Sequence, residues 1–205
     1  RDQFIRDLNW GTHSEVTFLR TEDDVELASV MYNAPVKEDD SSIPSSIIGT
    51  KSFTTQQRPD IVLRLTKRQR DIQYTFLFDA KYRISDKHPD DMDIPPSEAI
   101  DQMHRYRDAI YYIDPANQKP KREVIGGYVL FPGNYTREEF ENSRYYQSIK
   151  AIGIGAYPLR PSDGIVVDPN SSEQALREQI AEWLKRSRMK TYLYKNVAPQ
   201  HGLEY

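Results

Sequence analysis

Two aspartates and a lysine stand at the ends of two segments that have the composition of β-strands. The first segment begins Arg58-Pro59-Asp60-Ile61-Val62-Leu63, and the second ends Phe78-Asp79-Ala80-Lys81-Tyr82. Because successive side chains of a strand point to opposite faces, Asp79 and Lys81 project from the same face of the second strand. The sequence therefore predicts an acid and a base side by side at a strand end.

A short polar stretch, residues 67–71, separates the two segments and predicts a hairpin turn. The hairpin would bring Asp60 next to Asp79. Two carboxylates at one place do not both ionise easily unless a cation lies between them. Hard oxygen ligands of this kind suit Mg²⁺ or Mn²⁺, so we expect a divalent metal site where the two strands adjoin.

Pro59-Asp60 followed by Asp79-Ala80-Lys81 resembles the motif of the PD-(D/E)XK nuclease superfamily, which has the restriction-endonuclease-like fold. The helix expected next contains Gln102-Met103-His104-Arg105-Tyr106, which is similar to the Q-x-x-x-Y signature of RecB-type and lambda-exonuclease-type members. Gln102 and Tyr106 stand at positions i and i+4, and therefore lie on one helix face. The wider string 101–109 with 126–132 resembles more narrowly the nuclease domains of McrC-like restriction components.

The resemblance implies an α/β fold with a restriction-endonuclease-like core of element order αβββαβ, in which helices flank a central mixed sheet. It implies a Mg²⁺-dependent (or Mn²⁺-dependent) deoxyribonuclease of a bacterial restriction or phage-defence system. The metal ligands it implies are Asp60, Asp79 and the main-chain carbonyl of Ala80.

Further roles follow from the same resemblance. Lys81 would orient or deprotonate the attacking water, or stabilise the charge that develops on the phosphate. Gln102 would steady the metal-bound water or the substrate phosphate, and Tyr106 would support Gln102. Many members use one more acid on the first core helix, for which Asp2 and Asp7 are candidates if that helix is residues 1–9. Alternatively the helix lies upstream of Arg1.

The elements that must position these residues are predicted from apolar patterns and turn residues. We expect strands at 15–19 and 25–32, near 60–66 and 72–83, and at 124–131 and 152–157. Residues 35–50 and 84–96 predict loops. A helix is expected to begin with Ser97 as its N-cap and to continue an apolar stripe as far as Ile113. The last helix is expected over 171–190, beginning with a capping box at Ser171.

Length and composition limit the class of protein. The 205 residues fit one α/β domain, 1–205, and because the chain begins with Arg1 rather than Met we expect the C-terminal part of a longer protein. No cysteine is present, which excludes disulfides and indicates a reducing, cytoplasmic location. No apolar stretch is long enough to span a bilayer, so no membrane partner is expected.

The expected partner is DNA, although the net charge of −3 gives this little support. Basic residues cluster at 67–70, 119–122 and 185–190, but the DNA-contacting residues stay unassigned. The chain lacks a G-x-x-x-x-G-K-[ST] loop, so it does not hydrolyse nucleotides through a P-loop. The McrC-like resemblance implies that a separate McrB-like NTPase subunit would do so.

Other interpretations stay open from the residues alone. Lys81 would serve equally as the salt-bridge partner of Asp79, and Tyr106 as a core residue. The chain would then be a catalytically inactive nuclease-fold subunit, a DNA-binding or scaffold module, or an unrelated α/β protein. Another alternative is a DNA-repair exonuclease of RecB type, which would cut from DNA ends.

Overall fold

The computed structural model of the protein describes residues 14–19, 26–38, 49–67, 72–85, 93–114, 116–160 and 168–185. The helix predicted over residues 1–9, with its candidate acids Asp2 and Asp7, lies outside these ranges. Residues 186–190, predicted as the end of the last helix, also lie outside them. The described residues include both motif-bearing strands and the helix that follows.

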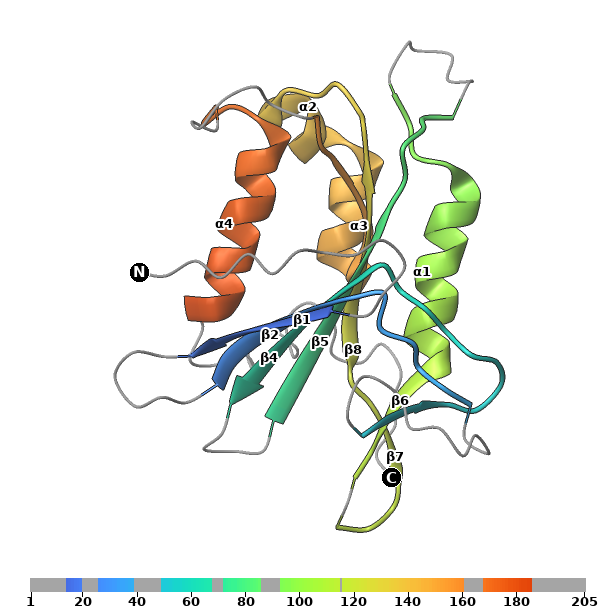
Figure 1. Ribbon diagram of the computed structural model, residues 1–205. Coiled ribbons are helices and arrows are strands. Elements are labelled where there is room, and N and C mark those ends of the chain that lie inside the picture. The colour runs from blue at the N-terminus through green and yellow to red at the C-terminus, as the bar shows by residue number, and fades with distance from the viewer. Residues whose placement is uncertain are drawn as a thin grey trace.

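The main sheet has six strands in the order β1-β2-β4-β5-β8-β9 (Figure 1). Their bounds are β1 Ser14–Leu19, β2 Glu26–Tyr32, β4 Ile61–Lys67, β5 Ile72–Ala80, β8 Val124–Phe131 and β9 Ile154–Pro158. The strands from β1 to β5 pair antiparallel, whereas β5 with β8 and β8 with β9 pair parallel. The predicted central mixed sheet is thereby confirmed.

Four helices of the described residues flank this sheet. They are α1 Ser97–Ala109, α2 Arg137–Asn142, α3 Arg144–Ile152 and α4 Ser172–Lys185. Helix α1 lies on one side of the sheet, with α3 and α4 on the other (Figure 1). With the short strands β3, β6 and β7 of the second sheet set aside, β2, β4, β5, α1 and β8 follow the order βββαβ along the chain, consistent with the predicted restriction-endonuclease-like fold. No helix among the described residues is both long and apolar enough to cross a membrane.

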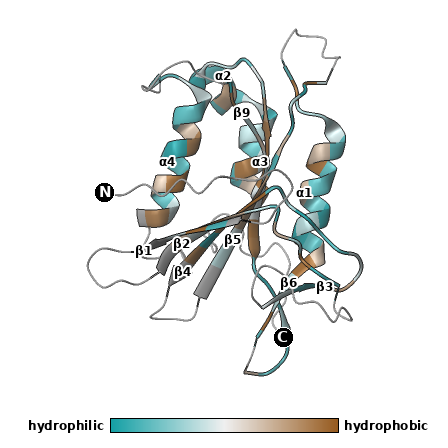
Figure 2. Ribbon diagram, in the orientation of Figure 1, coloured by the Kyte–Doolittle hydropathy of each residue, from teal (hydrophilic) through white to brown (hydrophobic). Residues whose placement is uncertain are grey.

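The two faces of β5 pack against different helices. On one face Phe76 stacks on Trp183 of α4, with ring centroids 3.9 Å apart. On the other face α1 approaches the sheet closely at Gly127, where an added Cβ would stand only 3.1 Å from the Cβ of Met103. The strip of hydrophobic colour on each helix in Figure 2 fits this amphipathic packing. Asp79 belongs to the α1 face, because strand alternation places it opposite to Phe76 and Phe78.

A buried ion pair joins the middle of β4 and the body of β5 to the residue that precedes β8. The Nε of Arg64 lies 3.3 Å from Oε1 of Glu123, and both side chains are less than a tenth exposed. The Thr75 hydroxyl donates to the same Glu123 oxygen over 2.6 Å. The charges of this cluster are matched one to one.

A small second sheet overturns one prediction. It contains β3 Thr50–Ser52, β6 Ile110–Ile113 and β7 Pro120–Arg122 in the order β3-β6-β7. The apolar stripe predicted to continue the helix to Ile113 is therefore interrupted at Ala109. Ile-Tyr-Tyr-Ile is β-branched and aromatic, and it forms a strand because the distant β3 and the nearby β7 supply antiparallel partners.

Three boundaries also differ from the predictions. The second motif strand ends at Ala80 rather than at residue 83. Ser97 is the first residue of α1, and Pro96 occupies the N-cap with φ −57° and ψ 131°, because the helix starts directly after an extended proline pair. Helix α4 starts at Ser172, although the Ser171 hydroxyl accepts from the Gln174 N–H at 3.2 Å, which is half of the predicted capping box.

Candidate active site

Asp60 and Asp79 lie opposite each other at the end of the β4–β5 hairpin. The last paired residues at this end are Ile61 and Phe78, and the two aspartates are the next residues along each strand. The Oδ2 atom of Asp60 accepts a hydrogen bond of 2.9 Å from the Ala80 N–H. The side chain of Asp60 therefore reaches across to the strand that carries Asp79, as the predicted hairpin requires.

Asp79 is almost completely buried, with 2% of its surface exposed. Burial is the main cause that raises the pKa of its carboxyl above its ordinary value. Contact with the Lys81 ammonium lowers this pKa, and the adjacent carboxylate of Asp60 raises it again. The ammonium therefore compensates only part of the cost of burying this acid beside a second one.

Lys81 stands between Asp79 and helix α1. Its Nζ atom forms an ion pair with Oδ2 of Asp79 and lies 3.5 Å from Oε1 of Gln102. The side chain is 26% exposed, so the ammonium is accessible from solvent. Its main-chain N–H donates to the Leu130 carbonyl over 2.8 Å, which fixes the end of β5 against β8.

Gln102 and Tyr106 project from one face of α1 and continue this chain of contacts. The Nε2 atom of Gln102 donates to the Tyr106 hydroxyl at 2.5 Å, and the hydroxyl donates to the Arg58 carbonyl at 2.9 Å. Burial, followed by the negative charge of Asp79, raises the pKa of Tyr106 to about 12. The phenol therefore keeps its proton at neutral pH and can act as a donor.

The hydrogen bonds run in one direction, from the Lys81 ammonium through Gln102 and Tyr106 to Arg58. Each donor and acceptor in the chain is used in a chemically consistent sense. Since Arg58 precedes Pro59 and Asp60, this series of hydrogen bonds connects both segments that carry predicted catalytic residues to helix α1. The structure thus brings together all five side chains selected from the sequence.

No sequence pattern predicted the role of the Arg58 carbonyl, because a main-chain acceptor can belong to any residue type. The candidate acids Asp2 and Asp7 lie outside the described residues. Within the ranges that the structure describes, no group of three or more His, Cys, Asp or Glu could hold a metal ion. A cation at this site would depend on two carboxylates together with main-chain oxygen and water.

A family model described as the PD-(D/E)XK nuclease superfamily matches residues 1–136. The match covers well over half of the chain and includes the hairpin with both aspartates, Lys81 and the whole of α1. The chain belongs to the PD-(D/E)XK nuclease superfamily. Comparisons with curated proteins and with solved structures gave no match.

Membership of the PD-(D/E)XK superfamily implies a nuclease, and members typically use divalent metals. The site of this member fits such an ion in its donor chemistry. Two carboxylates, one of them buried, face a single ammonium, so the charged groups sum to one net negative charge. Oxygen-only donors with excess negative charge match the preference of Mg²⁺ and Mn²⁺. The narrower McrC-like and Q-x-x-x-Y resemblances stay predictions.

Proposed function

We propose that the chain is a Mg²⁺-dependent DNA nuclease that hydrolyses phosphodiester bonds with Asp60, Asp79 and Lys81. The observation that carries the proposal is the placement of the two carboxylates opposite each other with one ammonium in contact. A structural ion pair needs only one acid for each base. The second acid, Asp60, adds a negative charge beyond the one that the single ammonium neutralises, and this charge would help to bind a cation.

Asp60, Asp79 and the Ala80 carbonyl would hold the ion. A bound Mg²⁺ would polarise the scissile phosphate and lower the pKa of a water molecule. Lys81 would orient that water, take its proton or stabilise the negative charge that accumulates on the phosphate. Lys81 suits these roles because its ammonium is already held beside Asp79 and is reachable from solvent.

The chain of hydrogen bonds from α1 supports the positioning of these groups. Gln102 would steady either the attacking water or a phosphate oxygen through its amide, which lies next to the Lys81 ammonium. Tyr106 would act as a positioning residue, since it holds both the Gln102 amide and the main chain just before Asp60. Because neighbouring groups already hold these side chains in place, less free energy is needed to reorganise the site during the reaction.

The biological setting that we propose is a bacterial restriction or phage-defence system, in which a separate McrB-like NTPase subunit drives cutting. This rests on the resemblance of 101–109 and 126–132 to McrC-like components. A second candidate is a RecB-type DNA-repair exonuclease, which the contact between Gln102 and Lys81 favours because it puts the Q-x-x-x-Y pair at the site. The two candidates differ in whether cutting requires a DNA end.

The test compares cleavage of circular and linear DNA with Mg²⁺, for the chain alone and together with a candidate NTPase. Asp79→Ala and Lys81→Ala should each abolish Mg²⁺-dependent cleavage. The melting temperature should stay similar or rise in Asp79→Ala, which removes a buried acid from the metal-free protein, and should fall in Lys81→Ala, which leaves two adjacent carboxylates without their ammonium. Asp101→Ala, an exposed acid on α1, is the matched control and should cleave like the wild type. Wild-type cleavage by either site variant would refute the proposal.

A further inference from the structure

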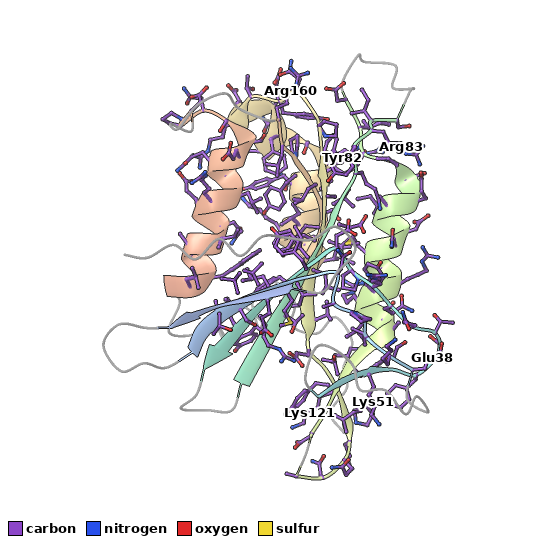
Figure 3. The ribbon with its side chains drawn as sticks, viewed as in Figure 1. Glu38, Lys51, Tyr82, Arg83, Lys121 and Arg160 are labelled. Atoms are coloured by element: carbon purple, nitrogen blue, oxygen red, sulfur yellow. The ribbon has the colours of Figure 1, made fainter. Side chains whose placement is uncertain are left out.

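Tyr82 directly follows Lys81 and presents its ring to solvent. It is 96% exposed, whereas Phe53, the next most exposed large hydrophobic residue of the described ranges, is 49% exposed. Tyr82 lines the same cleft as Leu176, Arg177 and Ile180 of α4, which places it toward the α4 side of the β5 end. In Figure 3 Tyr82 lies at the same end of the molecule as Arg83 and Arg160. A fully exposed aromatic ring contributes nothing to the core, and what gives this one a binding role is its place at the edge of a cleft beside Lys81.

The backbone that carries Tyr82 is fixed on both sides. The Lys81 N–H donates to the Leu130 carbonyl, and the Ser85 N–H donates to the Ile94 carbonyl, both over 2.8 Å. Between these anchors the Arg83 guanidinium forms an ion pair with Glu98 in the first turn of α1. The ring is therefore carried by a short loop that is anchored at both ends, and ordering this loop adds little to the entropic cost of binding a ligand.

Tyr82 lies at the edge of a cleft that also includes the catalytic lysine. The cleft has a volume of about 570 Å³, within the range usual for ligand sites, and its lining includes Lys81, Arg160 and Arg177. Leu130 and Leu176 contribute to an apolar lining between these cations. The single acid of the lining is Glu173, which is bonded to Arg177 at 2.9 Å, and Arg160 lies 4.0 Å from Asp93. The side chains of Arg160 and Arg177 are 58% and 61% exposed, so both guanidiniums can still reach a phosphate group.

The combination of an apolar lining, an exposed aromatic ring and a basic rim matches the parts of a nucleotide. A base offers flat faces that stack on aromatic rings, and its flanking phosphates attract arginine. In a continuous duplex both faces of a base are covered by its neighbours, so a protein ring stacks only on an unpaired or terminal base. A nucleotide in this cleft would also contact Lys81, so it would lie next to the phosphate that the site is proposed to cut.

We infer that Tyr82 stacks on an unpaired base next to the scissile phosphate, and that this nuclease site acts on DNA with a single-stranded segment. The inference rests on the proposed function, which supplies the identity of the polymer. The DNA backbone would cross the end of β5, from Asp60 and Asp79 on the α1 side to Tyr82 and Arg160 on the α4 side. Tyr82 would then determine the substrate class rather than the chemistry.

The experiment measures binding without cleavage, in the presence of a chelator. The probe is a short single-stranded oligothymidylate with one central 2-aminopurine, whose fluorescence falls when the base stacks. Tyr82→Ala should weaken binding roughly 5- to 150-fold, the equivalent of ~1–3 kcal/mol per stacked base, and should abolish the quenching. Tyr82→Phe should retain both. Phe53→Ala, the control for an exposed aromatic elsewhere, should behave as the wild type.

Cleavage of matched substrates with Mg²⁺ separates this inference from the proposed function. The wild type should prefer a duplex with a single-stranded segment to a blunt closed duplex, and Tyr82→Ala should lose that preference. Suppose that the wild type cleaves DNA, and that Tyr82→Ala binds the probe, quenches its fluorescence and prefers the single-stranded segment as strongly as the wild type does. The inference is then overturned and the nuclease proposal stands. If the wild type quenches the probe through Tyr82 but cleaves no DNA, the nuclease proposal is overturned and base stacking stands.

Discussion

Replacing Tyr106 by phenylalanine removes a single oxygen from the connection between α1 and the hairpin. The ring would stay in place, since Tyr106 is 5% exposed and packs within the core. Two hydrogen bonds would be lost, one received from Gln102 at 2.5 Å and one donated to the Arg58 carbonyl at 2.9 Å. Gln102 would be free to rotate away from Lys81, and the main chain before Asp60 would lose its anchor.

The size of the effect follows from these two bonds. Each neutral hydrogen bond contributes about 0.5–1.5 kcal/mol net, so the pair contributes about 1–3 kcal/mol to the free energy of unfolding. Gln102 and Arg58 are partly exposed, and water can replace the missing partner, which favours the lower half of that range. For a chain of this size the melting temperature should fall by about 2–8 °C.

The cleavage rate should fall by more than the stability change alone would cause. Below the melting transition both proteins are folded, so a loss of about tenfold in single-turnover cleavage with Mg²⁺ would report misplacement, equivalent to ~1.4 kcal/mol. Tyr111→Phe is the control, because this tyrosine on β6 packs its ring on Phe53 at 5.5 Å and lies outside the site. Unchanged melting and unchanged cleavage in Tyr106→Phe would refute the positioning role of this hydroxyl.

Two further predictions concern the same site. The raised pKa of Asp79 means that the folded, metal-free protein holds this proton more tightly than the unfolded chain. The resulting stability is present at acidic pH and is lost as the pH rises through the raised pKa. In urea unfolding with a chelator, the free energy of unfolding of Asp79→Asn should therefore increase relative to that of the wild type as the pH rises toward neutral. An identical pH dependence in both proteins would contradict this. Gln102→Ala should cut turnover by roughly ten- to a thousand-fold, or about 1.4–4 kcal/mol. Its melting temperature should fall by no more than about 1–6 °C, because one of the two hydrogen bonds of the Tyr106 hydroxyl is lost. Full activity in that variant would reduce Gln102 to a packing residue.

The sequence was sufficient for the parts of the site that depend on local pairing. Asp60 and Asp79 belong to neighbouring strands of one hairpin, so their apolar runs and the turn between them determine which residues oppose each other. Gln102 and Tyr106 were placed on one face by helical spacing alone. Their contacts with Lys81 and Arg58 depend on how α1 packs against the sheet, which no local pattern specifies.

The errors have two origins. Ile110 and Ile113 fit the apolar stripe of a helix, yet they form a strand, because β3 pairs with them from far along the chain and β7 folds back on them as a short hairpin. Helices α2 and α3 were missed although a local signal existed. Thr136 and Glu139 form a reciprocal capping box at the start of α2, and T-x-x-E is readable from the sequence.

The pair formed by Arg64 and Glu123 has a consequence for how much sequence change the protein tolerates at its candidate active site. That pair, with Thr75, joins β4, β5 and the residue before β8 through a charge-balanced cluster, and none of its members takes part in the site. The strand register is therefore held within the sheet, whereas the unbalanced charges lie at the strand ends. Mutational drift at Asp60 or Asp79 would then remove the proposed nuclease activity before it endangered folding, which is the condition under which an enzyme lineage can give rise to folded descendants that only bind.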